Sequence, residues 1–585
     1  MDFDYDVIII GSGVAGSLCA YKLAQHPGAR VLIIDPGVND VDMAQRMQFR
    51  KNYALTAQRS LGQLPTYMDL ARDRYAPSND SVDLLHYLDQ TPPPKPEENP
   101  TNKALYKVPY QRITGGSTWS WRGNCPRFIP SDFKLKATYG VGADWPIDYG
   151  TLEPWYCEAE KEIGISGNDA EWGKDSNLVK LGIGGARSQN FPMPNIVQSY
   201  SDKKIIAAIG GTMVVGEDLM PGGRKVEVIS TPQARISDNT KYPDRSDCRG
   251  NSNCIPLCPT GAKYDAGVHL RKALAAGAQI RKGSVVTRLE EAATGNVHTV
   301  VFRDWRTDPM KDLRLTAKIV VLAANAIESP KIWLNSGLGN KSDQVGLNLM
   351  DHLQTEVGGL FPEPIYTFRG PQGLSGIEVF RDGPFRKTAG AFRMTIGNDG
   401  WGRLEIPTKS IDSLFFQDNT VPPLLLGKAF KEKLRDRLTR MMRISCSTEQ
   451  LPLPENRVTL SDKKDELGLP RPQITYHVDD YSKKALENAS AVARKILGAI
   501  SDPKDIKPDK LAAPQDFNTA AHAMGTLRMG DKPENSVVNP FCRSHEHPNL
   551  YVAGSSVFVT SSTSNPTLTI AALALRTAAE IVKRL

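Results

Sequence analysis

The first 35 residues combine a buried strand, a glycine-rich turn, a helix and a second buried strand that ends in an acid. The apolar run 7–10 leads directly into GSGVAG at 11–16, and residues 17–25 follow with a helical pattern. A second apolar run, 31–34, ends at Asp35. Strands that are apolar on both faces are typical of parallel sheets covered by helices. The order of the segments therefore predicts a Rossmann-like unit and an α/β fold class.

Each glycine of this turn has a physical task in a dinucleotide site. Gly11 permits the tight turn, Gly13 lets the backbone approach a pyrophosphate, and Gly16 brings the helix against the strand. The positive end of the helix then faces the phosphates, and Asp35 accepts hydrogen bonds from a ribose hydroxyl. Both NAD and FAD bind to units of this kind. The unit alone thus predicts a dinucleotide and leaves open which one.

The length and charge of the chain limit the classes of protein to which it could belong. With 585 residues it exceeds what one hydrophobic core usually organises, so we expect two or more domains. The net charge of +7 is spread along the sequence, which argues against a nucleic-acid partner. The N-terminus is acidic and its apolar run has only four residues, so the sequence predicts no signal peptide. No stretch reaches the roughly 18 uninterrupted apolar residues of a membrane span.

Several later segments are expected to extend the nucleotide sheet. Residues 112–121 place small residues before two tryptophans, which would let a flat ring approach the backbone. The first and last parts of the chain would then share one sheet, with a second domain inserted between them. The expected elements are strands at 280–290, 318–326 and 550–554, a helix start at 329–331, an amphipathic helix at 481–500, a final helix at 567–583 and a surface loop at 91–100.

Four separated motifs, in order along the chain, resemble those of the glucose-methanol-choline (GMC) flavoprotein oxidoreductases. They are GSGVAG with Asp35, GGST at 115–118, HAMGT at 522–526 and SNPTLTIAALAL at 564–575. The resemblance implies FAD rather than NAD. It also implies a Rossmann-like FAD-binding domain of GMC type, with an inserted substrate domain built on an antiparallel sheet. The implied FAD-binding segments are 1–150, 226–352 and 513–585, and the implied substrate-domain segments are 151–225 and 353–512.

The resemblance also implies roles for individual residues. His522 matches the family's catalytic histidine, and a group with a pKa near 6.5 suits removal of a hydroxyl proton. Asn565 matches its partner and would hold the same oxygen while hydride leaves for flavin N5. Ser120 stands where some members carry a histidine bonded to the flavin, so we expect non-covalent FAD. The conspicuous pair Asp351-His352 is interpreted as a packed turn. The implied FAD-binding residues are Gly11, Gly13, Gly16, Asp35, Gly115, Gly116, Ser117, Thr118, Val285, Asn565, Pro566 and Thr567.

Three of the eight cysteines, Cys248, Cys254 and Cys258, fall within eleven residues, and a proline follows the last of them. Iron–sulfur clusters are held by cysteine thiolates, often with a proline after the final ligand, and three ligands suggest a [3Fe-4S] cluster. Zinc would need a fourth ligand, for which His269 is the nearest candidate. A disulfide would leave one thiol over. The other cysteines are expected to be buried packing residues: Cys19, Cys125, Cys157, Cys446 and Cys542.

The stretch CRGNSNCIPLCPTGAKYDA at 248–266 is similar to the iron–sulfur loop of one GMC subgroup. These are the large subunits of bacterial FAD-dependent glucose, fructose, sorbitol and gluconate dehydrogenases. The similarity implies oxidation of a sugar, polyol or aldonate, with electrons leaving through a [3Fe-4S] cluster to a multihaem cytochrome c subunit.

The same similarity implies a small subunit whose twin-arginine signal carries the folded chain to the periplasm. Contact with the inner membrane would then be made only through the partners. A cytoplasmic location is the alternative. Two other functions stay open, a glucoside 3-dehydrogenase of the same subgroup and a non-catalytic, redox-sensing flavoprotein.

Overall fold

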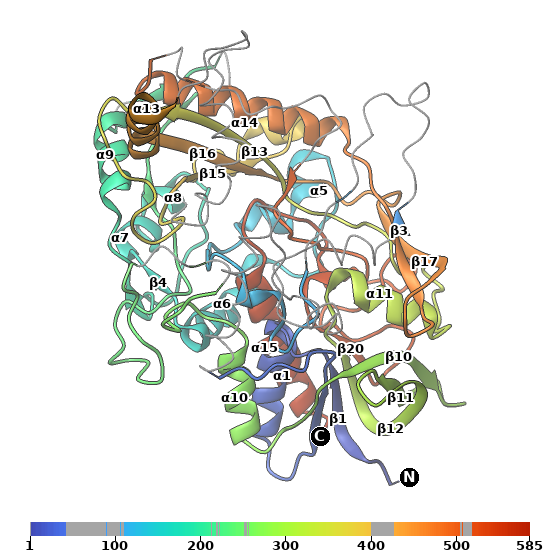
Figure 1. Ribbon diagram of the computed structural model, residues 1–585. Coiled ribbons are helices and arrows are strands. Elements are labelled where there is room, and N and C mark those ends of the chain that lie inside the picture. The colour runs from blue at the N-terminus through green and yellow to red at the C-terminus, as the bar shows by residue number, and fades with distance from the viewer. Residues whose placement is uncertain are drawn as a thin grey trace.

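The computed structural model has two large sheets with helices around them, and both termini lie beside the same sheet (Figure 1). It describes residues 2–42, 89–90, 106, 110–211, 213–217, 220, 223–250, 254, 257–398, 426–502, 506 and 518–585. The surface loop expected at 91–100 lies outside the described residues.

The first sheet is centred on β1 (Tyr5–Ile10), which runs parallel to β12 (Asp308–Leu322) on one side and β2 (Val31–Ile34) on the other. The side chains of β1 from Val7 onward are buried, as the apolar run predicts. β20 (Leu550–Val552) pairs in parallel with β12, so the first and last parts of the chain share this sheet, as expected. The remaining strands are β9 (Gln279–Arg281), β10 (Ser284–Glu291) and β11 (Val297–Asp304).

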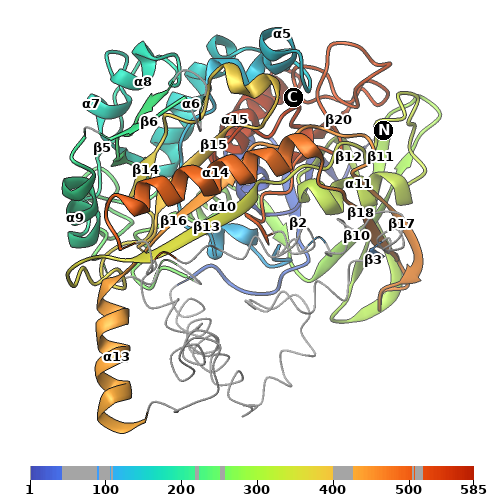
Figure 2. The same ribbon diagram turned by 90° about the horizontal axis from the view of Figure 1, so that it is seen from above.

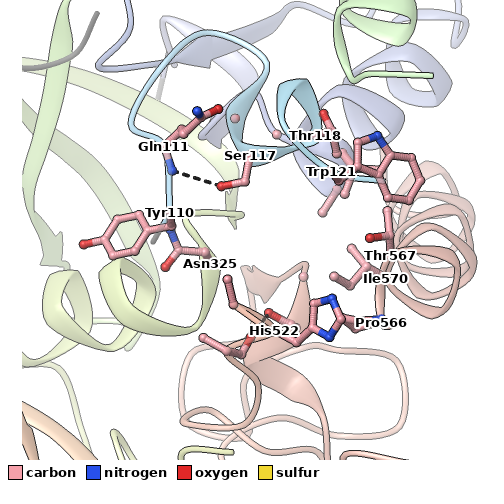
Figure 3. Close-up of a pocket in the computed structure, with 18 of the residues that line it drawn as sticks. Tyr110, Gln111, Ser117, Thr118, Trp121, Asn325, His522, Pro566, Thr567 and Ile570 are labelled. Carbon is pink, nitrogen blue, oxygen red and sulfur yellow. Dashed lines mark hydrogen bonds between the residues drawn. The ribbon is translucent and has the colours of Figure 1, made fainter. Parts of the chain in front are cut away.

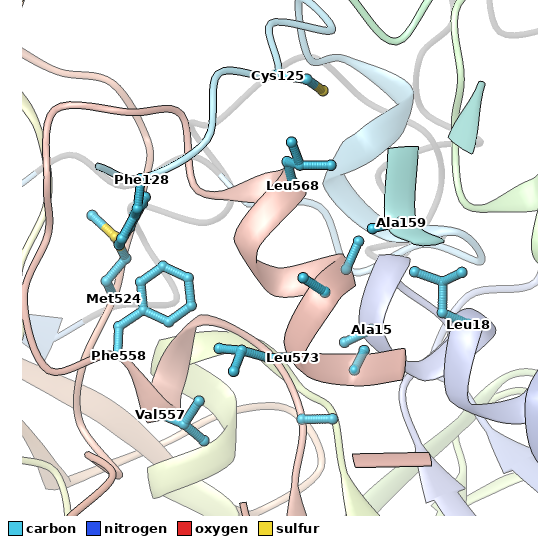
Figure 4. Packing of buried hydrophobic residues seen from close by; sticks show 14 of the residues in the cluster. Ala15, Leu18, Cys125, Phe128, Ala159, Met524, Val557, Phe558, Leu568 and Leu573 are labelled. Atoms are coloured by element: carbon cyan, nitrogen blue, oxygen red, sulfur yellow. The ribbon is translucent and has the colours of Figure 1, made fainter. Parts of the chain in front are cut away.

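A group of four helices packs together beside this sheet. α1 (Val14–Ala24) packs against α10 (Gly267–Ala275) and against α15 (Thr567–Val582), which also packs against α6 (Tyr149–Ile163). The core between them includes the small side chains of α1 and α6 and the leucines of α15, together with aromatic rings from the neighbouring loops (Figure 4). Small residues at the helix contacts let the backbones approach closely, which fills the space between helices at native density.

The second sheet is antiparallel over its paired strands. α14 (Asp480–Gly498) lies across β13 (Leu353–Leu360) and β16 (Met441–Thr448) and covers one face of the sheet (Figure 2). Burial alternates along β13, which is the pattern of a strand with two different faces. The order of strands is β19 (Asn518–Thr519), β13 (Leu353–Leu360), β16 (Met441–Thr448), β15 (Phe392–Ile396), β14 (Ser375–Ile377) and β8 (Ile229–Ser230).

Shorter elements complete the molecule. A small sheet of β17 (Arg457–Lys464), β18 (Pro470–Thr475) and β3 (Asp89–Gln90) packs against α11 (Asn325–Asn335). The other elements are η1 (Gly116–Trp119), η2 (Pro130–Phe133), α5 (Leu135–Tyr139), β4 (Ser166–Gly167), α7 (Asp169–Trp172), α8 (Asn177–Lys180), β5 (Met193–Pro194), α9 (Tyr200–Ile209), β6 (Val214–Val215), β7 (Arg224–Lys225), η3 (Pro384–Lys387), α13 (Gly427–Arg440) and η6 (Ser555–Val557).

The predicted fold class is confirmed, since a Rossmann-like parallel core and a separate antiparallel sheet are both present. The strand expected at 280–290 is two strands, because Gly283 has a φ of +64° and turns the chain between them. The helix expected from 329 begins earlier, at Asn325. β8 and β19 belong to the antiparallel sheet, although the segments that contain them are expected to belong to the FAD-binding domain. The domain boundaries themselves stay a prediction.

Sequence analysis did not single out α13. This helix has six Lys or Arg residues against two acids and no buried side chain, and it projects from the body of the molecule (Figure 2). Among the helices that the structure describes, none is long and apolar enough to cross a membrane.

Candidate active site

A cavity of about 610 Å³ lies between the carboxyl ends of β1 and β2 and one face of the antiparallel sheet. Ser117, Thr118 and Trp121 line one side of it, and His522 and Pro566 lie opposite (Figure 3). The residues predicted for FAD binding and catalysis all line this cavity except Gly16 and Gly115. The structure therefore brings together motifs that are separated by several hundred residues in the sequence.

The glycine-rich turn requires glycines for steric reasons that the structure makes explicit. Gly11 has a φ of +101°, and a Cβ on it would lie 2.7 Å from the carbonyl oxygen of Ala323. A Cβ on Gly16 would lie 1.9 Å from the carbonyl oxygen of Gly11, so this glycine sets how closely helix meets turn. By contrast, a Cβ on Gly13 would meet nothing within 4 Å. Because Gly13 lines the cavity, that open space is available to a ligand.

Asp35 braces this turn from the end of β2. Its Oδ2 accepts hydrogen bonds from the backbone nitrogen and the hydroxyl of Ser12, at 2.8 and 2.6 Å, and its Oδ1 accepts one from the nitrogen of Gly37. Burial raises the pKa of the Asp35 carboxyl, and these hydrogen bonds oppose the shift. The acid also lines the cavity. It can therefore both hold the turn and face a bound dinucleotide.

The GGST segment is tied to the turn by direct hydrogen bonds. The backbone nitrogen of Gly115 donates to the hydroxyl of Ser12 at 2.8 Å, which links Gly115 to Asp35 through one side chain. The hydroxyl of Ser117 accepts from the backbone nitrogen of Gln111 at 3.0 Å (Figure 3). Gly115 thus acts behind the cavity wall, although it does not line the cavity.

His522 and Asn565 lie side by side at the cavity. Asn565 Nδ2 is 3.4 Å from Nε2 of His522, and the other ring nitrogen, Nδ1, is 2.9 Å from Nδ1 of His352. His352 Nε2 is in turn 3.0 Å from the backbone carbonyl oxygen of Ser561. The predicted pair of site residues is therefore the outer part of a longer hydrogen-bonded chain.

The end of this chain fixes the tautomers of both histidines. A carbonyl oxygen only accepts, so Nε2 of His352 must carry hydrogen, and in the neutral ring Nδ1 is then the acceptor. Nδ1 of His522 must therefore donate to it, which leaves a lone pair on Nε2 of His522. That atom is the one beside Asn565 at the cavity. The arrangement presents a neutral imidazole with its basic nitrogen toward the space where a substrate would lie.

Burial keeps this imidazole neutral. It lowers the pKa of His522 well below its usual value, and the cationic side chains of Arg122 and Arg393 act in the same direction. Burial also lowers the pKa of His352, to about 4. Near neutral pH both rings are uncharged, which is the state that the hydrogen-bonded chain requires.

Asp351 links the backbones of the two histidines. Its Oδ1 accepts from the backbone nitrogens of His352 and His522, at 2.6 and 2.9 Å, and its Oδ2 accepts from the hydroxyl of Tyr106. Burial raises the pKa of Asp351 to about 7, against the effect of these bonds. Asp351 and His352 are both buried, which agrees with the interpretation of this pair as packed, and the ring of His352 also contacts His522. The Asp-His pair was visible in the sequence, but nothing there indicated its partner.

One face of the antiparallel sheet forms the cavity wall opposite the turn. Residues two apart on a strand point to the same face, which explains the spacing of the lining residues on β15 and β16. The wall is polar and consists mainly of small hydroxyl side chains with one amide and one guanidinium. The lining residues on this face are Gln354, Arg393, Thr395, Ser445 and Ser447. Such a wall offers several hydrogen bonds to a ligand that carries many hydroxyl groups.

The three clustered cysteines line a second, small cavity, of about 10 Å³. Cys254 and Cys258 are buried, Cys248 is partly exposed, and all eight cysteines are free thiols. Among the described residues, no group of three or more His, Cys, Asp or Glu side chains converges closely enough to hold a metal ion. His269 is occupied elsewhere, with its ring nitrogens 2.8 Å from Tyr264 and 3.2 Å from Glu162. The five scattered cysteines are buried, as predicted.

Two buried cations face the cysteine cavity. Arg235 bonds two backbone carbonyls through Nη2, whereas its Nε and Nη1 are buried with no hydrogen-bond partner among the described residues. Lys263 donates to the carbonyl oxygens of Trp119 and Trp121, at 2.9 and 2.5 Å. Among the described residues, both cations donate hydrogen bonds only to carbonyl groups, so no carboxylate is bonded to either of them. Cysteine thiolates around an anionic inorganic group would supply negative charge beside them. The three thiols and the partly unpaired guanidinium have the chemistry that an iron–sulfur cluster requires.

The two cavities share a wall. Trp121 and Gly123 line the large cavity, and Lys263, which lines the small one, is hydrogen-bonded to the Trp121 carbonyl. The indole of Trp121 donates to the carbonyl of Tyr264 at 2.7 Å, and Thr118 accepts from the nitrogen of Ala266. The chain that follows the cysteines is thus bonded directly to the segment that lines the large cavity.

Two family models of GMC oxidoreductases match the chain, at residues 212–354 and 452–574, and a model of the NAD(P)-binding Rossmann-like domain matches residues 9–39. The fructose dehydrogenase large subunit of Gluconobacter japonicus is 32% identical over 99% of this chain and 98% of its own length. The 2-methyl-1,2-propanediol dehydrogenase of Mycolicibacterium austroafricanum is 26% identical over 99% and 95%.

A solved structure has the same fold at low sequence identity. Pyridoxine 4-oxidase from Mesorbium loti matches with a TM-score of 0.61 and 19% identity, over 99% of both chains. Fructose, a branched diol and pyridoxine differ widely in shape. The solved structure therefore supports the fold alone, and the substrate must be inferred from the cavity.

Proposed function

Since the chain belongs to the GMC oxidoreductase family, whose members are FAD enzymes acting on CH–OH groups, we propose that it is the catalytic subunit of a sugar, polyol or aldonate dehydrogenase. The observation that carries this proposal is the placement of His522 and Asn565 on the same cavity as the glycine-rich turn. The polar sheet face opposite the turn supports a substrate with several hydroxyl groups.

The residues around the cavity fit FAD. Gly11, Gly13 and Asp35 would receive its pyrophosphate and ribose, at the N-terminal end of α1. Ser117, Thr118, Pro566 and Thr567 would line its ring, and Val285 on β10 would meet the adenine. When bound, FAD supplies the acceptor for hydride. Ser120 has no chemistry for a covalent link to the ring, so we propose that FAD is held non-covalently.

The side chains of this protein would handle the proton. His522 presents a lone pair on Nε2, so it would take the proton of the substrate hydroxyl. Asn565 Nδ2 would donate to the same oxygen as negative charge develops there. His352 would keep the resulting imidazolium in place through its bond to Nδ1. This complete proton-accepting arrangement favours an enzyme over a non-catalytic, redox-sensing flavoprotein.

We further propose that Cys248, Cys254 and Cys258 hold a [3Fe-4S] cluster that takes electrons onward one at a time. The unpaired Arg235 atoms and the wall shared with the large cavity support this assignment. A cluster at these cysteines would supply one-electron transfer, so another protein, rather than dioxygen, would be the final acceptor. Zinc analysis and iron analysis of the purified protein separate the two metal hypotheses, because a cluster requires about three irons per chain.

We propose partners on the same basis. The relative in Gluconobacter japonicus is described as a large subunit, which supports a complex with further subunits for this chain. A multihaem cytochrome c subunit would accept the electrons, and a small subunit with a twin-arginine signal would carry the folded chain to the periplasm. Neighbouring reading frames that encode both proteins would support this arrangement, and their absence would favour a cytoplasmic enzyme.

A substrate panel tests the proposed function. Purified holoenzyme is mixed without oxygen with single sugars, polyols, aldonates and glucosides, and the flavin absorbance is followed. We expect at least one sugar or polyol to bleach the flavin, and turnover to continue with an artificial electron acceptor. Bleaching by glucosides alone would favour a glucoside 3-dehydrogenase. A flavin that no member of the panel reduces would contradict the proposal.

A further inference from the structure

Arg393 is a buried cation at the cavity with an unusual set of partners. It lies on β15, is 3% exposed and lines the same cavity as His522. Its Nε is 3.2 Å from both carboxylate oxygens of Glu378, and its Nη2 is 2.5 Å from Oε1 of the same residue. The remaining terminal nitrogen, Nη1, donates to Oδ1 of Asn565 at 3.2 Å. One edge of the guanidinium is therefore fixed by Glu378, and the other reaches the proposed active site.

The contact with Arg393 determines which way the Asn565 amide faces. A guanidinium has donors and no acceptor, so the atom of Asn565 that it contacts must be the oxygen. The NH2 group then points toward Nε2 of His522, 3.4 Å away. That direction agrees with the lone pair that the Ser561 carbonyl imposes on His522 from the opposite end.

A single hydrogen-bonded chain thus runs from Arg393 through Asn565, His522 and His352 to Ser561. It begins at a group that can only donate and ends at a group that can only accept. Every intermediate direction is fixed as a consequence, including the amide orientation, which is ordinarily ambiguous. Without Arg393, the amide of Asn565 could turn over and present its oxygen to the cavity.

We propose that Arg393, held by Glu378, is a positioning residue that keeps the NH2 group of Asn565 toward the reacting oxygen. The inference rests on the proposed function. In the reaction the hydroxyl proton passes to Nε2 of His522, and the carbon–hydrogen pair leaves as hydride for the flavin. The oxygen gains negative charge while its O–H bond breaks. An NH2 group stabilises that charge, whereas an amide oxygen in the same place would repel it.

A mutant cycle on the holoenzyme tests the proposal. R393M alone would leave the buried Glu378 carboxylate with only the more distant Arg381, at 3.6 Å, so the pair is removed together as R393M/E378Q. The other variants are N565A and the triple variant R393M/E378Q/N565A. Flavin reduction is followed without oxygen after mixing with D-fructose, or with whichever member of the panel bleaches the wild-type flavin fastest.

We expect N565A to slow flavin reduction about 100-fold, as loss of one donor to a developing oxyanion does. R393M/E378Q should slow it at least about tenfold, with a smaller change in the half-saturating substrate concentration. The triple variant should be no slower than N565A, because Arg393 acts through Asn565. Effects that multiply, or a wild-type rate in R393M/E378Q, would overturn the proposal.

Two controls separate positioning from folding. Each variant is assayed for bound FAD and thermal midpoint, and rates are given per bound flavin. The matched control is R584M/E580Q, which removes an arginine–carboxylate pair near the C-terminal end of α15, where neither residue lines the cavity. We expect this control to reduce its flavin at the wild-type rate. If no member of the panel reduces the wild-type flavin, the proposed function fails. That result is distinguishable from a failure of the Arg393 proposal, which would appear only in the variants.

Discussion

The Nδ1 atoms of His352 and His522 lie 2.9 Å apart, and only one of them carries hydrogen. Because His352 donates from Nε2 to the Ser561 carbonyl, the hydrogen between the rings belongs to His522. His352 is buried, whereas His522 is half-buried and lines the cavity. The two histidines, 170 residues apart in the sequence, therefore act as one proton-accepting unit in our account.

Replacing His352 should slow the reaction without removing FAD. In H352A the Nδ1–H of His522 loses its acceptor. The other tautomer, with hydrogen on Nε2, then becomes accessible, and a smaller fraction of molecules has a lone pair at Nε2. We expect flavin reduction to slow by up to about 100-fold, the lower end of what a positioned general base contributes. H352Q keeps an acceptor in reach and should recover part of the loss. Equal rates in wild type and H352A would contradict this assignment.

The pH dependence of flavin reduction should reflect the depressed pKa of His522. Burial favours the neutral ring, so the base form persists well below the ordinary histidine value of about 6.5. We expect the rate to stay level from pH 8 down past pH 6.5 and to fall only in more acid solution. An acid limb centred at or above about pH 6.5 would show that His522 is solvated or is not the base.

Stability should decrease as the pH falls from about 6.5 toward 4. Burial lowers the pKa values of His352 and His269 to about 4, whereas the same groups titrate near 6.5 in the unfolded chain. Between these values the unfolded state binds more protons, so the free energy of unfolding falls by about 1.4 kcal/mol per pH unit for each group. H352Q should show a shallower fall in thermal midpoint over this window. An unchanged slope in H352Q would contradict the burial of a neutral ring.

Two glycines of the turn should respond differently to alanine. A Cβ at Gly16 would lie 1.9 Å from the Gly11 carbonyl oxygen, so G16A should destabilise the protein with or without FAD. A Cβ at Gly13 meets no protein atom within 4 Å, so G13A should leave the apoprotein's thermal midpoint unchanged. Because that Cβ would occupy space at the cavity, G13A should weaken FAD binding, measured by fluorescence titration of the apoprotein. Wild-type FAD affinity in G13A would contradict the proposed pyrophosphate position.

The cysteine cavity leads to a prediction that does not depend on activity. C254S should remove the iron and the low-temperature EPR signal of the oxidised protein, while the flavin remains bound. C446S changes a buried thiol on β16 and serves as the matched control, with iron retained. Wild-type protein that contains one zinc per chain and no iron would exclude the cluster and the electron path through it.

Sequence reasoning located the fold and most of the cavity because those features depend on local patterns. Apolar runs of β1 and β2, the glycines between them and Asp35 all lie within one short stretch, where periodicity and steric needs are directly readable. The same holds for the final helix, α15. The prediction of one continuous strand at 280–290 was wrong at Gly283, since a single glycine can either continue a strand or turn the chain.

What sequence reasoning missed is long-range and polar. His352 meets His522 because β13 begins beside the HAMGT segment, and Arg393 meets Asn565 because β15 lies against the loop that precedes α15. Neither contact leaves a spacing signal in the chain. The cations beside the cysteines were missed for the same reason, as Arg235 lies 13 residues before Cys248 and has no motif of its own.

The most direct measurement compares wild type with H522A in a single anaerobic turnover, using the panel's fastest sugar or polyol and following the flavin absorbance. We expect H522A to retain FAD and to reduce it about 100- to 10,000-fold more slowly, while the control H26A, at a half-buried residue that does not line the cavity, matches wild type. Flavin in H522A that bleaches as fast as in wild type would contradict the account, because the cavity would then oxidise its substrate without the base we assign to it.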